Sequence, residues 1–283
     1  MKKRVLIAGC GYLGAATADL FHDSGWLVEG WTQSNESAAR LAAKPYAVSA
    51  VDIANAAAVR AARNEFDVVI HCASSGGGDA ESYRRLYLEG ARNLLTELQP
   101  ARFIYTSSTS VYAQIGGESV YEESPAEPTH ATGRLLREIE ALVTQNQGVV
   151  ARLAGIYGPG RSALLRKFLS GEAQIEGSGE RFLNQAHRDD IAAALLHLIA
   201  LPDETGIVNV VDNQPLTQRE CYQWLATRLS RPLPPVTKAP GTRKRGTSNK
   251  RVSNQKLRRL GWEPNYPTFP IGMDTSVLPA AGL

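Results

Sequence analysis

The sequence lacks long apolar runs and has few cysteines, and these two gaps exclude several classes of protein. No stretch approaches 18 consecutive apolar residues, so a membrane-spanning helix is not expected. The three cysteines, Cys10, Cys72 and Cys221, are scattered and odd in number, with no Cys-x-x-Cys pair or Cys/His cluster. We therefore expect buried free thiols, and neither a disulfide framework nor a metal site.

Charge is also modest, at 21% of 283 residues with a formal net charge of +3. So small an excess gives no general reason to expect binding to nucleic acid. The start, MKKRVLIAGCGYLG, imitates a secretory signal, but its apolar part is short, interrupted by glycine and not followed by a clean cleavage site. We interpret it as a first β-strand and expect a cytoplasmic protein.

Short apolar runs alternate with longer helix-like segments through the first half of the chain. The runs expected as strands are 4–9, 26–32, 67–73, 102–108 and 148–155, and the helix-like segments are 12–24, 35–43, 55–64, 80–99 and 129–146. Strands that alternate with helices of this length predict right-handed crossovers and a parallel sheet with helices on both faces. The fold class expected is therefore a doubly wound α/β protein.

The sequence GCGYLG directly follows the first expected strand and opens the first expected helix. Its glycines, Gly9, Gly11 and Gly14, have the spacing of a dinucleotide-binding turn. In such a turn the first glycine permits the tight bend, the second lets a pyrophosphate approach the backbone, and the third lets helix and strand pack closely. With Tyr12 and Leu13, the start of the helix offers N–H groups to the anion. This context predicts a Rossmann-type domain that binds NAD or NADP.

The ends of the second and third strands leave the choice of dinucleotide open. The position of a ribose-binding carboxylate falls on Thr32 or Gln33, whereas Glu29 lies in mid-strand. The missing carboxylate removes repulsion towards a 2′-phosphate and slightly favours NADP. Asp52 could bind the adenine amino group, with Ile53 packing beneath the ring, or it could simply cap a helix.

Five ordered stretches resemble the extended short-chain dehydrogenase/reductase family, specifically its NAD-dependent epimerase/dehydratase group. RFIYTSSTSVYA resembles the strand-five motif with its catalytic Ser or Thr, ARLAGIYGPGR the strand-six motif, and NQAHRDDIAAAL the His-x-Asp-Asp segment. IVNVVDNQPLTQRE and KLRRLGWEP resemble the distal strand and the C-terminal helix. The resemblance covers nearly the whole chain, and it implies further cofactor contacts at Cys72, Ala73, Ser74, Ala154 and Ile156.

This sequence departs from the family at the acid–base pair. Aligning Tyr112 with the Tyr that ends the family's Ser motif makes Ser108 the catalytic hydroxyl, and the family's Tyr-x-x-x-Lys then falls on Thr132 and Leu136. No lysine occurs between positions 44 and 167, and the hydroxyl of Thr132 is too weak an acid to replace a phenol. We predict that the usual proton relay is absent, and the candidate catalytic positions are Ser108, Tyr112 and Thr132.

Other groups near these motifs admit two interpretations each. Tyr112 could face the cleft or pack in the core, and Tyr121 could close over a substrate or lie on the surface. Arg134 and Arg137 could supply the charge of the missing lysine but not its proton exchange. The segment containing His187 and Asp189 is expected to give structural support.

The segment from Lys238 to Arg259 carries nine basic residues and no acidic one. The resemblance implies that basic residues of this part hold the diphosphate of a sugar nucleotide, while a solvated loop is the alternative. Nucleic acid is not expected, because no aromatic residues are interleaved with the charges.

The two functional hypotheses share one architecture: residues 1–155 as the dinucleotide-binding domain, with later segments interleaving, and residues 156–283 as a smaller substrate lobe. The first hypothesis is an NAD(P)-dependent epimerase/dehydratase-like oxidoreductase without the Tyr-x-x-x-Lys pair, acting on a polar or sugar-nucleotide-like small molecule. The second is an inactive NAD(P)-binding sensor or partner protein. The family resemblance also implies that a homodimer could form through 80–99 and 129–146.

Overall fold

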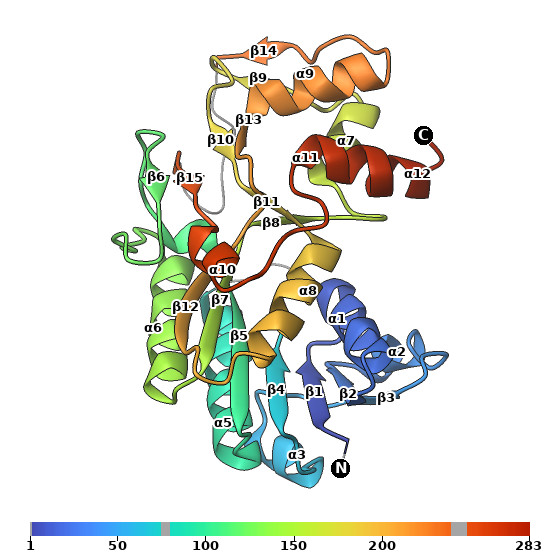
Figure 1. Ribbon diagram of the computed structural model, residues 1–283, viewed down its shortest axis with the longest axis vertical. Coiled ribbons are helices and arrows are strands. Elements are labelled where there is room, and N and C mark those ends of the chain that lie inside the picture. The colour runs from blue at the N-terminus through green and yellow to red at the C-terminus, as the bar shows by residue number, and fades with distance from the viewer. Residues whose placement is uncertain (1, 75–79, 239–247) are drawn as a thin grey trace. The chain divides into compact units, whose positions relative to one another are not determined.

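The computed structural model describes residues 2–74, 80–238 and 248–283 (Figure 1). The chain divides into two compact units. The first comprises Met1–Val111, Pro128–Arg152 and Ile191–Val208, and the second comprises Tyr112–Glu127, Leu153–Asp190 and Asn209–Leu283. The chain therefore passes repeatedly between the units, and the segment 112–127, expected in the first domain, belongs to the second unit.

The first unit is built on a seven-stranded sheet with the order β12-β7-β5-β4-β1-β2-β3. The pairs β1–β2, β1–β4, β2–β3 and β4–β5 are parallel. The direction of strand order reverses at β1, which confirms the doubly wound α/β fold. The strands are β1 (Arg4–Ala8), β2 (Leu27–Thr32), β3 (Ala47–Ala50), β4 (Val68–His71), β5 (Arg102–Ser108), β7 (Val149–Leu153) and β12 (Gly206–Val210).

Helices follow the strands in the order that the periodicity predicts. They are α1 (Tyr12–Asp23), α2 (Asn35–Ala39), α3 (Ala56–Ala61), α4 (Ala80–Tyr83), α5 (Gly90–Leu98), α6 (Ala131–Gln145) and α8 (Arg188–Ile199). The segment 80–99, expected as one helix, is interrupted by the π-helix η1 (Arg84–Glu89) between α4 and α5. A short 3₁₀ turn, η2 (Thr109–Val111), follows β5.

Helix α6 is fixed in the first unit by a buried ion pair. The carboxylate of Glu140, 1% exposed, receives Nε and Nη2 of Arg152 at 3.0 and 2.7 Å. It also accepts hydrogen bonds from Ser107 Oγ at 2.6 Å and from Arg137. Since Arg152 lies on β7 and Ser107 on β5, this carboxylate joins the helix to two neighbouring strands.

The second unit consists of small sheets and helices around a separate apolar core. Its strand pairs are β15–β6, β11–β8, β14–β9 and β10–β13, with bounds β6 (Ser119–Val120), β8 (Gly155–Tyr157), β9 (Ile175–Glu176), β10 (Phe182–Leu183), β11 (Gln185–His187), β13 (Leu216–Thr217), β14 (Val236–Thr237) and β15 (Arg251–Val252). The helices are α7 (Ala163–Leu169), α9 (Gln218–Arg228), α10 (Gln255–Arg259), α11 (Phe269–Gly272), η3 (Met273–Val277) and α12 (Leu278–Ala280). The core gathers Tyr157, Ile175, Cys221, Leu225, Phe269 and Met273.

Several smaller expectations can be compared with this fold. All three cysteines are free and buried, as expected. Within the described ranges no helix is both long and apolar enough to cross a bilayer. The basic segment contains β15 and α10, and its part from 239 to 247 lies outside the described residues.

Candidate functional site

The glycine-rich turn between β1 and α1 can be built only with glycine at two of its positions. Gly9 has φ +97°, and a Cβ there would lie 2.2 Å from the backbone nitrogen of Ala73. A Cβ on Gly14 would lie 2.2 Å from the carbonyl oxygen of Gly9. The turn is also held by N–H groups of Gly9 and Cys10, which both donate to the carbonyl of Trp31 at 2.9 and 2.8 Å. The backbone is therefore bent tightly against both neighbouring strands.

The same turn leaves space where a pyrophosphate would lie. A Cβ on Gly11 would meet no atom within 4 Å. Gly11 is the N-cap of α1, no side chain caps the helix, and no acidic residue stands in its first turn, which contains Tyr12 and Leu13. The first-turn N–H groups and the positive end of the helix dipole can thus serve an anion. These features fit the pyrophosphate of NAD or NADP.

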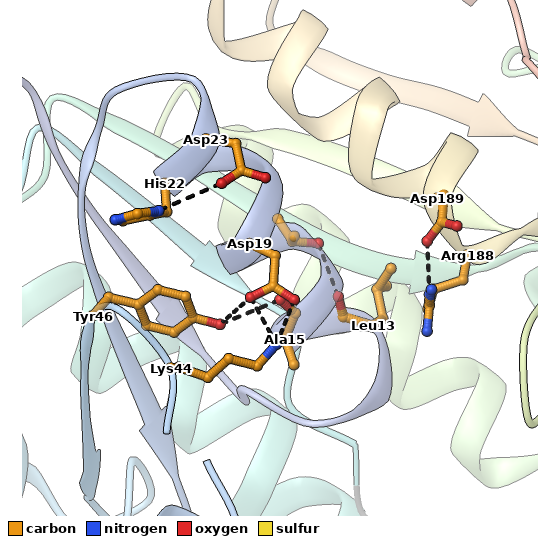
Figure 2. Close-up of polar contacts among 10 residues, drawn as sticks. Leu13, Ala15, Asp19, His22, Asp23, Lys44, Tyr46, Arg188 and Asp189 are labelled. Carbon is orange, nitrogen blue, oxygen red and sulfur yellow. Dashed lines mark hydrogen bonds and ion pairs between the residues drawn. The ribbon is translucent and has the colours of Figure 1, made fainter. Parts of the chain in front are cut away.

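Helix α1 is also anchored along its length by a polar cluster (Figure 2). The carboxylate of Asp19 receives Nζ of Lys44 at 2.7 and 2.9 Å and the hydroxyl of Tyr46 at 2.8 Å. Tyr46 and Lys44 lie between α2 and β3, so the cluster ties this connection to α1. Burial, with Asp19 nearby, raises the pKa of the Cys10 thiol to about 11, which makes this cysteine unreactive at neutral pH.

At the end of β2 the structure offers hydroxyl and amide groups rather than a carboxylate. Thr32 is buried and its hydroxyl donates to the carbonyl of Ser34 at 3.2 Å, while Gln33 is exposed. Glu29 lies three residues earlier, and its carboxylate accepts from Nε1 of Trp31 at 2.8 Å and Nδ2 of Asn64 at 3.1 Å. Glu29 is therefore held at mid-strand, where the sequence analysis put it.

Asp52 and Ile53, expected at the end of the third strand, lie just beyond β3, which ends at Ala50. Asp52 accepts a hydrogen bond from the backbone nitrogen of Ala54 at 3.1 Å and forms an ion pair with Arg85. It does not cap α3, whose N-cap is Asn55. Ile53 is buried, with its Cδ1 against Gly90.

The predicted cofactor residues after β4 lie beside the glycine turn. Ala73 is the residue that Gly9 touches, and Cys72 donates its backbone N–H to the carbonyl of Ala8 at 2.7 Å. Burial raises the pKa of the Cys72 thiol to about 12. Ser74 is exposed at the carboxyl end of the strand. The sheet thus brings Gly9, Cys72, Ala73 and Ser74 to one edge of the first unit.

Ser108 ends β5, and its Oγ accepts a hydrogen bond from the backbone nitrogen of Ser110 at 3.2 Å. On α6, Thr132 is half-buried and Leu136 is only 7% exposed. Between them in the helix, Gly133 packs against Pro128 and the ring of His130. The buried isobutyl group of Leu136, predicted to replace the family's lysine, supplies neither charge nor a hydrogen-bond donor.

Tyr112, the other candidate for catalysis, has the surroundings of a packing residue. It is 0% exposed, and its hydroxyl donates to Oδ1 of Asn209 at 2.9 Å. Its carbonyl accepts from Nζ of Lys250 at 2.7 Å. All three residues belong to the second unit, where this burial counts against proton exchange by Tyr112. Tyr121, in contrast, is 41% exposed.

The second unit contains a buried cation, Lys250, and a half-buried one, Arg181. Lys250 is 5% exposed and donates to Ser248 Oγ at 2.9 Å as well as to Tyr112. Burial, followed by repulsion from Arg181, lowers the pKa of Lys250 to about 8. Burial also lowers the pKa of Arg181, and within the described chain its buried Nε has no hydrogen-bond partner. The second unit therefore holds concentrated positive charge.

The other predicted cofactor contacts, Ala154 and Ile156, and the His and Asp residues expected to give structural support also belong to the second unit. Ala154 is buried and donates its N–H to Val210 at 3.1 Å, and Ile156 lies half-buried on β8. His187 lies 3.0 Å from Ser276 Oγ and accepts from the backbone nitrogen of Asp189 at 3.2 Å. Burial lowers the pKa of His187 to about 4, so the ring is neutral. These contacts are those of a supporting residue.

No sequence pattern gave a role to Tyr87 or singled out Lys250 among the nine basic residues of the segment from Lys238 to Arg259. Lys250 stands 138 residues from its partner Tyr112, a separation that no local pattern encodes. Tyr87 had a weak signal, since Tyr83 and Tyr87 occur four residues apart in an expected helix. As for metals, no group of three or more potential His, Cys, Asp or Glu ligands is found in the part of the chain that the structure describes.

Comparison with known proteins identifies a family and several relatives of this chain. The model of the NAD-dependent epimerase/dehydratase family matches residues 5–211. Protein YeeZ of Escherichia coli K12 is 30% identical over 279 residues, covering 94% of this chain and 97% of that protein. A Methylobacillus flagellatus structure, provisionally assigned as an NAD-dependent epimerase/dehydratase, is 27% identical, with a TM-score of 0.82 and full coverage of both chains. The Thermus thermophilus UDP-glucose 4-epimerase in complex with NAD is 22% identical, with a TM-score of 0.81 and 99% coverage of each chain; it supports the fold.

Proposed function

This chain belongs to the NAD-dependent epimerase/dehydratase family, and we propose that it is an NADP-preferring oxidoreductase of this family that works without the Tyr-x-x-x-Lys pair. Its substrate is a polar, anionic small molecule of the sugar-nucleotide type. The observation that carries the proposal is the turn at Gly9, Gly11 and Gly14, which is tight against both strands and open in front of α1.

A dinucleotide titration tests this turn. A side chain on Gly11 has room in the protein and would project into the space that the pyrophosphate needs, so Gly11→Val should fold and lose NADPH and NADH binding. Gly116→Val is the matched control, because a Cβ there meets only the flexible carboxylate of Glu118, at 3.1 Å. Equal dinucleotide affinity in Gly11→Val and the wild type would refute the proposal.

The preference for NADP rests on the end of β2. Thr32 and Gln33 are uncharged, and the Glu29 carboxylate is engaged by Trp31 and Asn64. Thr32 and Gln33 carry no charge that would repel a 2′-phosphate, whereas an NAD-binding site has a ribose-binding carboxylate at this position. We expect NADPH to bind more tightly than NADH. A higher affinity for NADH in calorimetry would contradict this part of the proposal.

The anionic substrate follows from Arg181 and Lys250 in the second unit. Holding the buried Lys250 beside the half-buried Arg181 costs free energy, and a bound phosphate would relieve that cost. Structural relatives include enzymes of UDP-glucose and dTDP-glucose, which makes nucleoside diphosphates the natural first ligands to try.

The second candidate function is an NAD(P)-binding sensor or partner protein without catalysis. Leu136 favours it, because a buried isobutyl group occupies the place of the family's lysine. The two candidates differ in hydride transfer, measured as the loss of NADPH absorbance with a panel of sugar nucleotides. Turnover by the wild type supports the enzyme. Tight dinucleotide binding without turnover in the wild type, together with turnover in Thr132→Tyr/Leu136→Lys, supports the sensor.

A further inference from the structure

The first unit carries a phenol close to the exposed end of β4. Tyr87 lies in the π-helix η1, and its hydroxyl is 3.4 Å from the hydroxyl of Ser74. Ser74 is exposed, whereas Tyr87 is 8% exposed. A π-helical segment within a longer helix often marks a functional site, because it changes the direction of side chains that a regular helix would place elsewhere.

Aromatic neighbours fix the orientation of this phenol. The ring of Tyr83 stacks on Tyr87 with centroids 4.9 Å apart, and the ring of His71 stacks at 6.4 Å. His71 is the last residue of β4 and is paired in register with Tyr105 on β5. Burial lowers the pKa of His71 to about 4, so its ring is neutral and packs without charge. Tyr87 therefore lies over the carboxyl end of β4, whose last residue is level with the middle of β5.

The carboxyl end of β4 belongs to the half of the sheet that the adenosine does not use. In a doubly wound sheet the dinucleotide crosses the point where strand order reverses, with its pyrophosphate at the first helix. Here the reversal lies at β1, the ribose-recognition positions Thr32 and Gln33 follow β2, and Ser74 follows β4 on the other side. Ala73 touches Gly9, so Ser74 is one residue from the pyrophosphate turn.

We propose that the hydroxyls of Tyr87 and Ser74 form a pair that hydrogen-bonds the nicotinamide riboside of the dinucleotide. This inference rests on the proposed function. It supplies hydroxyl donors from η1 and the end of β4, and η1 packs against α6, the helix that carries Thr132 and a buried Leu136 instead of a phenol and an ammonium. The pair acts by binding and orientation, so it can be tested without knowing the substrate.

The test compares a whole dinucleotide with its adenosine half. Calorimetry with NADPH should show about five- to tenfold weaker binding to Tyr87→Phe than to the wild type, as expected for one lost hydrogen bond. Binding of 2′,5′-ADP, which lacks the nicotinamide riboside, should be unchanged. The emission shift of reduced nicotinamide on binding should also shrink in Tyr87→Phe, which reports on that end of the ligand directly.

Matched variants separate this role from packing. Tyr83→Phe removes the hydroxyl of the stacking neighbour and should leave both affinities unchanged. Ser74→Ala should weaken NADPH binding, and its effect should not add fully to that of Tyr87→Phe, because the two hydroxyls share one ligand. Unchanged NADPH affinity in Tyr87→Phe, or an equal loss for 2′,5′-ADP, would overturn the inference. A wild type that binds neither ligand would overturn the proposed function as well.

Discussion

In the first unit the buried carboxylate of Glu140 lies against the guanidinium of Arg152, whereas in the second unit the buried carboxyls of Asp190 and Asp212 accept hydrogen bonds from backbone N–H groups. Asp190 accepts from the nitrogens of residues 265 and 266 at 2.7 and 3.0 Å, and Asp212 accepts from Gln214 at 3.2 Å. Burial raises the pKa of both carboxyls. The neighbouring Asp189 raises the pKa of Asp190 further, and Asp190 raises that of Asp212.

The cations of the two units differ in the same way. Arg152 is matched by Glu140 within the first unit, while Arg181 and Lys250 in the second unit have their pKa values lowered by burial. A matched pair fixes a frame whose stability depends little on pH or ligands. The buried charged groups of the second unit are held by neutral partners, so its stability should depend on both pH and bound ligands. Such a dependence is useful where a charged substrate must bind.

The largest effect is expected where the matched pair is broken. Glu140→Ala leaves the guanidinium of Arg152 buried without its carboxylate and should lower the free energy of unfolding by about 3–5 kcal/mol. The control is Glu138→Ala on the same helix, where the ion pair with Arg84 is half-exposed and contributes at most about 1 kcal/mol. Urea unfolding of both variants provides the measurement, and equal losses would contradict a special role for the buried pair.

The next effect is a pH dependence carried by the second unit. Burial raises the pKa of Asp190 from 3.8 to about 6, so the folded state holds this proton at a pH where the unfolded state has released it. The resulting stabilisation is full below the unfolded pKa and is lost as pH rises through about 6. The shift corresponds to roughly 3 kcal/mol.

Asp190→Asn should therefore flatten the change in unfolding free energy between about pH 4 and 6 relative to the wild type. Glu138→Asn serves as a control that removes a carboxyl from the exposed face of α6. Parallel pH profiles for the wild type and Asp190→Asn would show that Asp190 is ionised in the folded protein throughout this range.

A smaller effect on stability is expected when an anion binds beside Arg181 and Lys250 in the second unit. A nucleoside diphosphate present at ten times its dissociation constant should stabilise the protein by about 1.4 kcal/mol and raise its melting temperature. Added salt should weaken the effect, and Arg181→Met should abolish it, whereas Arg92→Met, exposed on α5, should not. A panel of such ligands without any shift would leave the solvated-loop interpretation of the basic segment in place.

The sequence could predict the glycine turn because its constraints are local. Positive φ at Gly9 and the close approach at Gly14 can be inferred from residue identity and spacing, and the strands and helices around them follow from periodicity. The π-helix at Tyr87 was not predicted, because an extra residue in a helical turn leaves no apolar pattern of its own. Lys250 was expected only as one of nine basic residues in its segment, because its burial and its partner 138 residues away are not encoded locally.

The smallest effect on stability concerns Tyr112, a candidate catalytic residue in the sequence that is buried in the structure. Tyr112→Phe removes one hydrogen bond to Asn209 and should cost about 1 kcal/mol of stability, because the amide oxygen loses its donor in the second unit. Tyr121→Phe, on an exposed side chain, should cost almost nothing. Since a phenol that is 0% exposed and bonded to an amide has no path to substrate, NADPH affinity and any hydride transfer should both survive the substitution. A rate that falls more than tenfold while stability falls by only this amount would instead make Tyr112 the proton donor, and the buried charges of the second unit would then serve catalysis as well as binding.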